Sequence, residues 1–262
     1  MTRNKASQIA QAILSEKGLE RKLPVPVEDL AQNERVTIKL LTIERRFEGR
    51  LELCAGKPTI FVNDHGRGIE YPRTRFTLAH ELGHFFLHRR WLIRGGTFHD
   101  AEILRGDNLR EVEREANDFA AECLLPERLV VKFLNGRLLG LERVQELAEQ
   151  AQASIVATAI RVARITSSRC CFFFERDGVI RWVAPSDDWR EARFVWSRWK
   201  GSMPEASHAR GSSEAFEERE VPLQVWCPNA PPRDEPLFES ALQTSYGRLV
   251  LVFDGAAESL IG

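Results

Sequence analysis

The stretch Arg-Phe-Thr-Leu-Ala-His-Glu-Leu-Gly-His, residues 75–84, contains the pattern H-E-x-x-H. Its two histidines, His80 and His84, are four residues apart and therefore project from one face of a helix, about one turn from each other. Both imidazoles can then reach the same tetrahedral zinc ion, with Glu81 beside the metal-bound water as general base. The spacing predicts a hydrolytic zinc site.

The helical register of this segment favours the zinc site over a chance match. At about 100° per residue, one narrow arc of the helix holds Thr77, His80, Glu81, His84 and His88. Apolar residues cover the rest of its circumference, which predicts a buried helix. Histidines on the one polar stripe of a buried helix are costly to desolvate unless a metal or other partners satisfy them.

A second helix, predicted over 107–126, offers the third protein ligand that a catalytic zinc needs. Glu113 lies inside its apolar face, whereas Glu111 points away and Glu115 lies at the edge. A carboxylate directed into a core needs a cation, which is either the zinc or a buried arginine. Asn117, one turn later, can hydrogen-bond to a ligating side chain.

The two motifs together resemble the ImmA/IrrE family of metallopeptidases. Residues 75–84 supply the first motif, and residues 113–126, Glu-Arg-Glu-Ala-Asn-Asp-Phe-Ala-Ala-Glu-Cys-Leu-Leu-Pro, supply the second. The resemblance covers roughly residues 1–165, and Leu125 stands where the family usually has Met. It implies a general base at Glu81 and Zn²⁺ ligands at His80, His84 and Glu113.

The resemblance also implies a fold and a function. The fold is α+β, a gluzincin-like zinc peptidase domain. The expected activity is that of a zinc-dependent, site-specific endopeptidase, which cleaves a helix-turn-helix repressor and so derepresses a stress, mobile-element or defence operon. The alternative is a non-proteolytic, zinc-containing sensor that binds DNA directly. The oxyanion-stabilising residue stays open among Tyr71, His88 and His99.

Composition and cysteine content limit the possible partners and compartment. With 43% hydrophobic residues, 29% charged residues and a net charge of −1, the chain has no general attraction to nucleic acid or membrane. No apolar run approaches a membrane span, so a cytoplasmic protein is expected. Five cysteines do not form a disulfide framework, and most should be buried. Cys54 either occupies the open zinc position as a regulatory thiol or has no role.

The sequence predicts three parts, namely a peptidase domain (1–126), a helical hairpin (127–166) and a small α+β sensory domain (167–262). In the first part, strands are expected near 36–41, 49–54 and 59–63. By resemblance, the last of these is an edge strand that holds an extended substrate. Alternatively, it simply packs behind the active-site helix.

The hairpin resembles a helix-turn-helix, with a break near 152–154 and a second helix capped by Ser154. Residues 127–165 contain six basic and four acidic side chains, and the second helix opens with Ile, Val, Ala and Thr. This composition favours packing or protein docking over duplex recognition.

The C-terminal part contains four apolar runs of strand length, at residues 170–174, 179–184, 223–226 and 249–253. Basic side chains are interleaved among four tryptophans, namely Trp182, Trp189, Trp196 and Trp199. Such a cluster is typical of a stacking platform for single-stranded nucleic acid or a nucleotide, which would act as an activator. The competing interpretation is a core that uses tryptophan.

Overall fold

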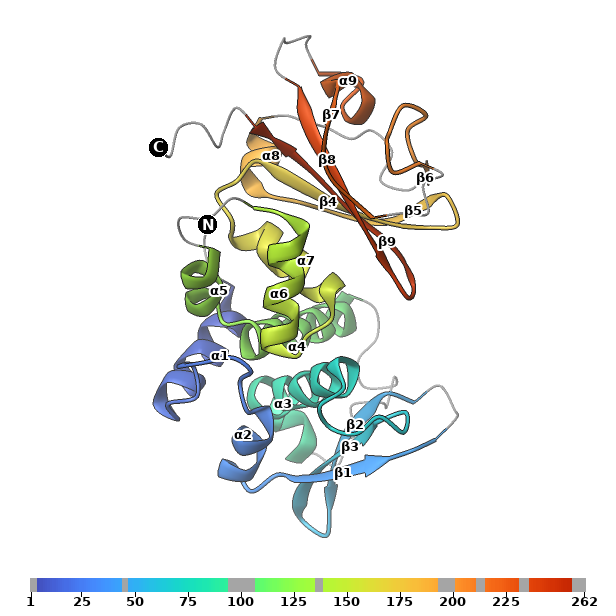
Figure 1. The fold of residues 1–262 in the computed structure, drawn as a ribbon. Helices are drawn as coiled ribbons and strands as arrows, with labels where there is room; N and C mark the ends of the chain where they lie inside the picture. Colours follow the sequence, from blue (N-terminus) through green and yellow to red (C-terminus); the bar gives the residue numbers. More distant parts are fainter. Residues whose placement is uncertain are drawn as a thin grey trace. The chain divides into compact units, whose positions relative to one another are not determined.

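The computed structural model describes residues 4–43, 47–93, 107–134, 139–192, 201–210, 215–230 and 236–255 (Figure 1). These residues form a mixed α+β protein. Contacts divide the chain into two compact units, Met1–Leu129 with Ala148–Ser154, and Val130–Leu147 with Ile155–Gly262. The predicted three-part division stays a prediction.

The helices of the first unit pack around the H-E-x-x-H segment. Asn4 caps the first of them by accepting from the Ser7 N–H at 2.9 Å, and its amide nitrogen lies 2.6 Å from Asp118 Oδ2. Gly83 allows the last two to approach closely, because a Cβ there would lie 3.0 Å from Ala116 Cα. These helices are α1 (Lys5–Glu16), α2 (Val27–Asn33), α3 (Pro72–Ile93) and α4 (Asp107–Leu124).

A three-stranded sheet packs against α3. It consists of β1 (Thr37–Leu41), β2 (Gly49–Cys54) and β3 (Lys57–Asn63), in the order β1-β3-β2. β3 pairs with β1 in parallel and with β2 in antiparallel register. The prediction that β3 is an edge strand is therefore wrong. The tight turn at Ala55 and Gly56, both with positive φ, brings β2 alongside one edge of β3. β1 pairs with the other edge. Among the described strands that pack against α3, the one at an edge of the sheet is β2.

Three further helices follow, namely α5 (Glu127–Leu134), α6 (Leu141–Ala151) and α7 (Ile155–Ile165). The expected break is present, with Gln152 at φ 49°. α7 packs on β4 (Cys170–Arg176) and β5 (Val179–Pro185) of the second sheet, and its buried positions include Arg161. This face of α7 is therefore unavailable to a DNA groove, as the packing interpretation expects.

The second unit is built on a six-stranded antiparallel sheet in the order β6-β5-β4-β9-β8-β7. Figure 1 shows α7 on one side of this sheet and α9 on the other. The elements after α7 are β4 (Cys170–Arg176), β5 (Val179–Pro185), α8 (Asp187–Glu191), β6 (Gly201–Ser202), β7 (Phe216–Val221), α9 (Leu223–Trp226), β8 (Leu237–Thr244) and β9 (Gly247–Asp254).

One of the four predicted strands is wrong, because residues 223–226 form the short helix α9. The Cys227 N–H donates to the Leu223 carbonyl at 2.8 Å and closes a helical turn, and the Trp226 indole donates to Glu239 at 2.8 Å. A four-residue apolar run has no periodicity that separates strand from helix. Tertiary contacts therefore decided this segment.

Two of the four clustered tryptophans, Trp182 and Trp189, lie among the described residues. Trp189 is buried in the core, and Trp182 stacks on Phe174 with ring centroids 5.7 Å apart. Trp196 and Trp199 lie outside the described residues. Trp189 thus fits the core interpretation, whereas Trp182 is half-buried.

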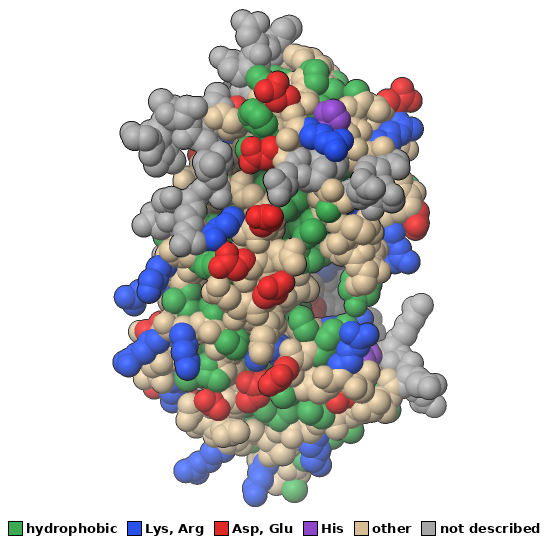
Figure 2. Space-filling view, viewed as in Figure 1, with side chains coloured by type: hydrophobic (Ala, Val, Ile, Leu, Met, Phe, Trp, Pro, Cys, Tyr) green, Lys and Arg blue, Asp and Glu red, His purple; other side chains and the backbone are tan. Residues whose placement is uncertain are grey.

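The surface agrees with the small net charge. On the face in Figure 2, Lys and Arg side chains are interspersed with Asp and Glu. Among the described residues, none of the helices combines the length and the apolar character that crossing a membrane requires. All five cysteines are free thiols, and four of them are buried, as expected.

Candidate metal centre

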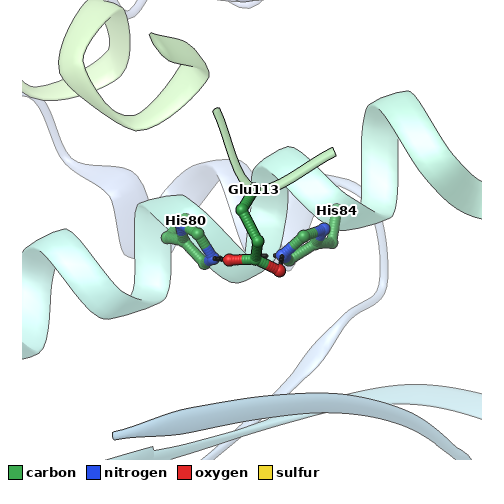
Figure 3. A group of neighbouring side chains, drawn as sticks. All are labelled: His80, His84 and Glu113. Carbon is green, nitrogen blue, oxygen red and sulfur yellow. Dashed lines mark hydrogen bonds and ion pairs between the residues drawn. The ribbon is translucent and has the colours of Figure 1, made fainter. Parts of the chain in front are cut away.

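Three side chains from α3 and α4 converge on one point (Figure 3). His80 Nε2 lies 3.2 Å from Glu113 Oε2, and His84 Nε2 lies 3.4 Å from Glu113 Oε1. The two Nε2 atoms are 3.0 Å apart. Ligand atoms on a tetrahedral zinc with bonds of about 2.0–2.1 Å are separated by about 3.3 Å. The three side chains therefore fit one such ion.

The outer ring nitrogens strengthen this interpretation. His80 Nδ1 lies 3.0 Å from the Asn117 amide oxygen, and His84 Nδ1 lies 3.2 Å from His88 Nδ1. If each Nδ1 donates its proton outward, both Nε2 lone pairs point at the space that the Glu113 carboxylate also faces. Three converging acceptors need a cation or a proton between them.

Glu113 is held by the histidines and not by an arginine. Its side chain is 43% exposed, and its ion-pair partners in the described part of the chain are His80 and His84. Hydrogen bonds from these two rings hold the pKa of Glu113 well below its usual range. The carboxylate is thus ionised and available as a metal ligand.

Glu81 lies beside this group, 5% exposed and next to the edge strand. Burial raises the pKa of Glu81 to about 7, and the charge of Glu113 also raises it, whereas His80 and a hydrogen bond from the Leu51 N–H oppose the rise. A bound divalent cation would favour the carboxylate. Gly49 makes room for Glu81, because a Cβ there would lie 3.0 Å from Glu81 Oε1.

The structure does not bring every candidate residue to this centre. The Cys54 thiol donates to Glu52 Oε1 at 3.4 Å and is outside the three-residue group. Tyr71 precedes α3, where Arg67 lies over its ring, and His99 lies outside the described residues. His88 contacts the Nδ1 side of His84, away from the converging Nε2 atoms, which argues against an oxyanion role.

Sequence reasoning missed the neighbours of Glu81 and the partner of His88. The Leu51 N–H and Gly49 belong to β2, and no motif links that strand to the helix. Glu115 Oε2 lies 3.0 Å from His88 Nε2. The only sequence signal for this pair was the polar arc of α3, which includes position 88.

A family model and a solved structure are similar to this chain. The Peptidase_M78 model, described as the IrrE N-terminal-like domain, matches residues 31–163. The solved structure of a Mycobacterium tuberculosis transcriptional regulator has a similar fold, with a TM-score of 0.62 at 13% identity, covering 98% of this chain and 78% of that one. A search of curated proteins finds no match. Since the matched model spans half of the chain, the protein belongs to the Peptidase_M78 family of IrrE N-terminal-like domains.

Proposed function

We propose that this protein is a zinc-dependent, site-specific endopeptidase of the gluzincin type, which cleaves a helix-turn-helix repressor. The observation that carries the proposal is the convergence of His80, His84 and Glu113 beside the buried Glu81, in a chain of a peptidase family. Cleavage would derepress a stress, mobile-element or defence operon in the cytoplasm. The structural neighbour is a transcriptional regulator, which agrees with this setting.

The chemistry divides between the metal and the chain. Zinc held by the three ligands would polarise the scissile carbonyl and lower the pKa of the attacking water. Glu81 takes the proton of that water and passes it to the leaving amine nitrogen. In the metal-free chain burial raises the pKa of Glu81 to about 7, and a bound cation would favour the ionised carboxylate that acts as the base.

We further propose that the substrate backbone lies along β2. Glu48 and Asn63 are hydrogen-bonded across the β2–β3 pair, so the alternate residues Leu51 and Leu53 direct their backbone groups toward the side of β2 that no other described strand covers. The Leu51 N–H meets Glu81 on that side, and Leu53 is 44% exposed. A peptide added to β2 would therefore pass the general base.

The activating signal is a separate proposal. Single-stranded nucleic acid or a nucleotide remains the ligand class to try, with Trp182, Trp196 and Trp199 as candidate contacts. Salt-dependent quenching of tryptophan fluorescence by an oligonucleotide, together with faster repressor cleavage, would support it. Unchanged fluorescence in a chain that cleaves its repressor would show that the signal enters elsewhere.

The central experiment combines metal analysis with a cleavage assay. The purified chain is loaded with Zn²⁺ and incubated with the helix-turn-helix repressor encoded beside it, and the products are identified by mass spectrometry. We expect about one zinc per chain and cleavage at one peptide bond. A zinc-loaded chain that leaves the repressor intact and binds operator DNA itself would instead establish the non-proteolytic sensor.

A further inference from the structure

We propose that His88 and Glu115 form a positioning pair for His84, a candidate metal ligand of the proposed function. His88 Nδ1 lies 3.2 Å from His84 Nδ1, and His88 Nε2 lies 3.0 Å from Glu115 Oε2. The three groups form a chain that starts at the metal-facing ring and ends on α4. This chain connects the two ligand helices in addition to the contacts of Glu113 and the His80–Asn117 hydrogen bond.

The proton positions in this chain are determined by the metal. When His84 Nε2 faces a cation, its proton sits on Nδ1 and is donated to His88 Nδ1, which must therefore be the acceptor. The proton of His88 then sits on Nε2 and is donated to the Glu115 carboxylate. Each hydrogen bond has one donor and one acceptor. A carboxylate at the end of such a chain fixes the orientation of the ligating ring and increases its basicity.

Burial keeps water away from the two histidine rings of this arrangement. The side chain of His84 is 2% exposed and that of His88 is 6% exposed, so water has little access to their ring nitrogens. Glu115, at 31% exposure, stays partly hydrated while its carboxylate reaches His88. The backbone of α3 leaves helical geometry at His88, with φ −122° and ψ 16°, at the residue whose ring bridges the two helices.

The other candidate histidine ligand is held differently. His80 meets the amide oxygen of Asn117, an exposed residue, at 3.0 Å. One ligand is thus oriented by a neutral amide at the surface, and the other by a buried imidazole backed by a carboxylate. Since a buried partner that is itself fixed by a carboxylate constrains a ring more strongly than an exposed amide, removing His88 should weaken metal binding more than removing the Asn117 amide.

The test measures zinc affinity by competition with a chromophoric chelator, and ligand geometry by the visible absorption of the Co²⁺-loaded chain. His88→Phe removes the acceptor and should weaken zinc binding about 10- to 100-fold. His88→Gln restores an acceptor oxygen and should recover part of that loss. Glu115→Gln should fall between wild type and His88→Phe. The matched control on the same helix is Glu111→Gln, an exposed carboxylate that pairs with Arg114, which should bind zinc like the wild type.

The outcomes separate positioning from simple packing. Wild-type affinity in both His88→Phe and Glu115→Gln would overturn the proposal. So would equal losses in His88→Phe and His88→Gln, accompanied by equal drops in the melting temperature of the metal-free chain, because the ring would then only fill space. If the affinities change as expected and no repressor is cut, the positioning pair stands and the peptidase proposal fails. A wild-type chain that takes up neither metal overturns both.

Discussion

Two carboxylates, one in each unit, meet opposite surroundings. Glu239 is fully buried, and its two oxygens accept from Ser207 Oγ at 2.9 Å, the Ala209 N–H at 2.7 Å and the Trp226 indole at 2.8 Å. Glu113 is half-exposed and faces two ring nitrogens that also converge on each other. The chain supplies fixed donors for the first carboxylate, whereas the second faces two ring nitrogens that become acceptors once their protons sit on Nδ1. A carboxylate satisfied by fixed donors holds a fold together, whereas converging acceptors prepare a place for a cation.

The largest expected effect separates the base from the ligands within the metal centre. Glu81→Gln keeps the size of the side chain but cannot accept the proton, so cleavage should fall about 10²- to 10⁴-fold. Zinc content should stay at about one per chain, because Glu81 is proposed as a base and not as a ligand. Initial rates and metal analysis on the same sample check this. Loss of the metal together with the activity would place Glu81 among the ligands.

The second prediction removes each of the two compared carboxylates in turn. Glu113→Ala should lose most of the zinc, whereas Glu239→Ala should keep it and lose roughly 3 kcal/mol or more of stability, because three buried donors lose their acceptor. Metal analysis and denaturant unfolding of both full-length variants measure this. Equal zinc loss in the two variants would contradict the contrast between them.

The third prediction concerns the close approach of the ligand helices. In an open helix, Gly→Ala stabilises by up to about 1 kcal/mol, but at Gly83 the new Cβ would lie 3.0 Å from Ala116 Cα and 3.2 Å from Phe119 Cβ. Gly83→Ala should therefore destabilise by about 1–3 kcal/mol and weaken zinc binding by displacing Glu113. Melting and chelator competition are the measurements.

A glycine in open space is the control for this variant. At Gly140 a Cβ would have no described atom of another part of the chain within 4 Å, so Gly140→Ala should leave zinc binding unchanged. A stabilised Gly83→Ala chain with wild-type zinc affinity would show that α4 can move without cost.

The smallest effect is expected at Cys54. A thiol that occupied the open zinc position would raise basal cleavage when replaced by serine. Because the Cys54 thiol donates to Glu52 on its own strand, we expect Cys54→Ser to leave the basal rate of repressor cleavage unchanged. A clear increase in that rate would restore the thiol switch.

Short-range patterns predicted the helices of the first unit well and its sheet only in part. The H-E-x-x-H segment lies on the helix α3, the helix predicted from residue 107 is present as α4, and so are the three expected strands. The order of the strands was not predictable, because β1 pairs with β3 and not with β2, the next strand in the sequence. The alternation of side chains along a strand does not determine which strand pairs with it. The same reason explains why β2, and not β3, lies at an edge of the sheet.

In the second unit the sequence predicted less. The runs at 170–174, 179–184 and 249–253 are strands, but β7 and β8 were missed because their charged and polar residues interrupt the apolar pattern. The buried Glu239 belongs to β8, where burial of a carboxylate depends on donors from residues 207, 209 and 226. Such donors are distant in sequence, so composition could not reveal them.

The sequence by itself determined which residues converge on the candidate metal centre. Spacing of four on α3 and the register of α4 place His80, His84 and Glu113 on facing sides of two helices, and helical periodicity is a local property. Only the tertiary structure decided which groups of other elements contact Glu81 and which groups contact the outer nitrogen of His84. The Leu51 N–H at Glu81 and the His88–Glu115 pair at His84 depend on how separate elements pack, whereas Asn117 beside a ligand was expected from its place one turn after Glu113. Periodicity directs a side chain toward a neighbour, but packing decides which neighbour it meets.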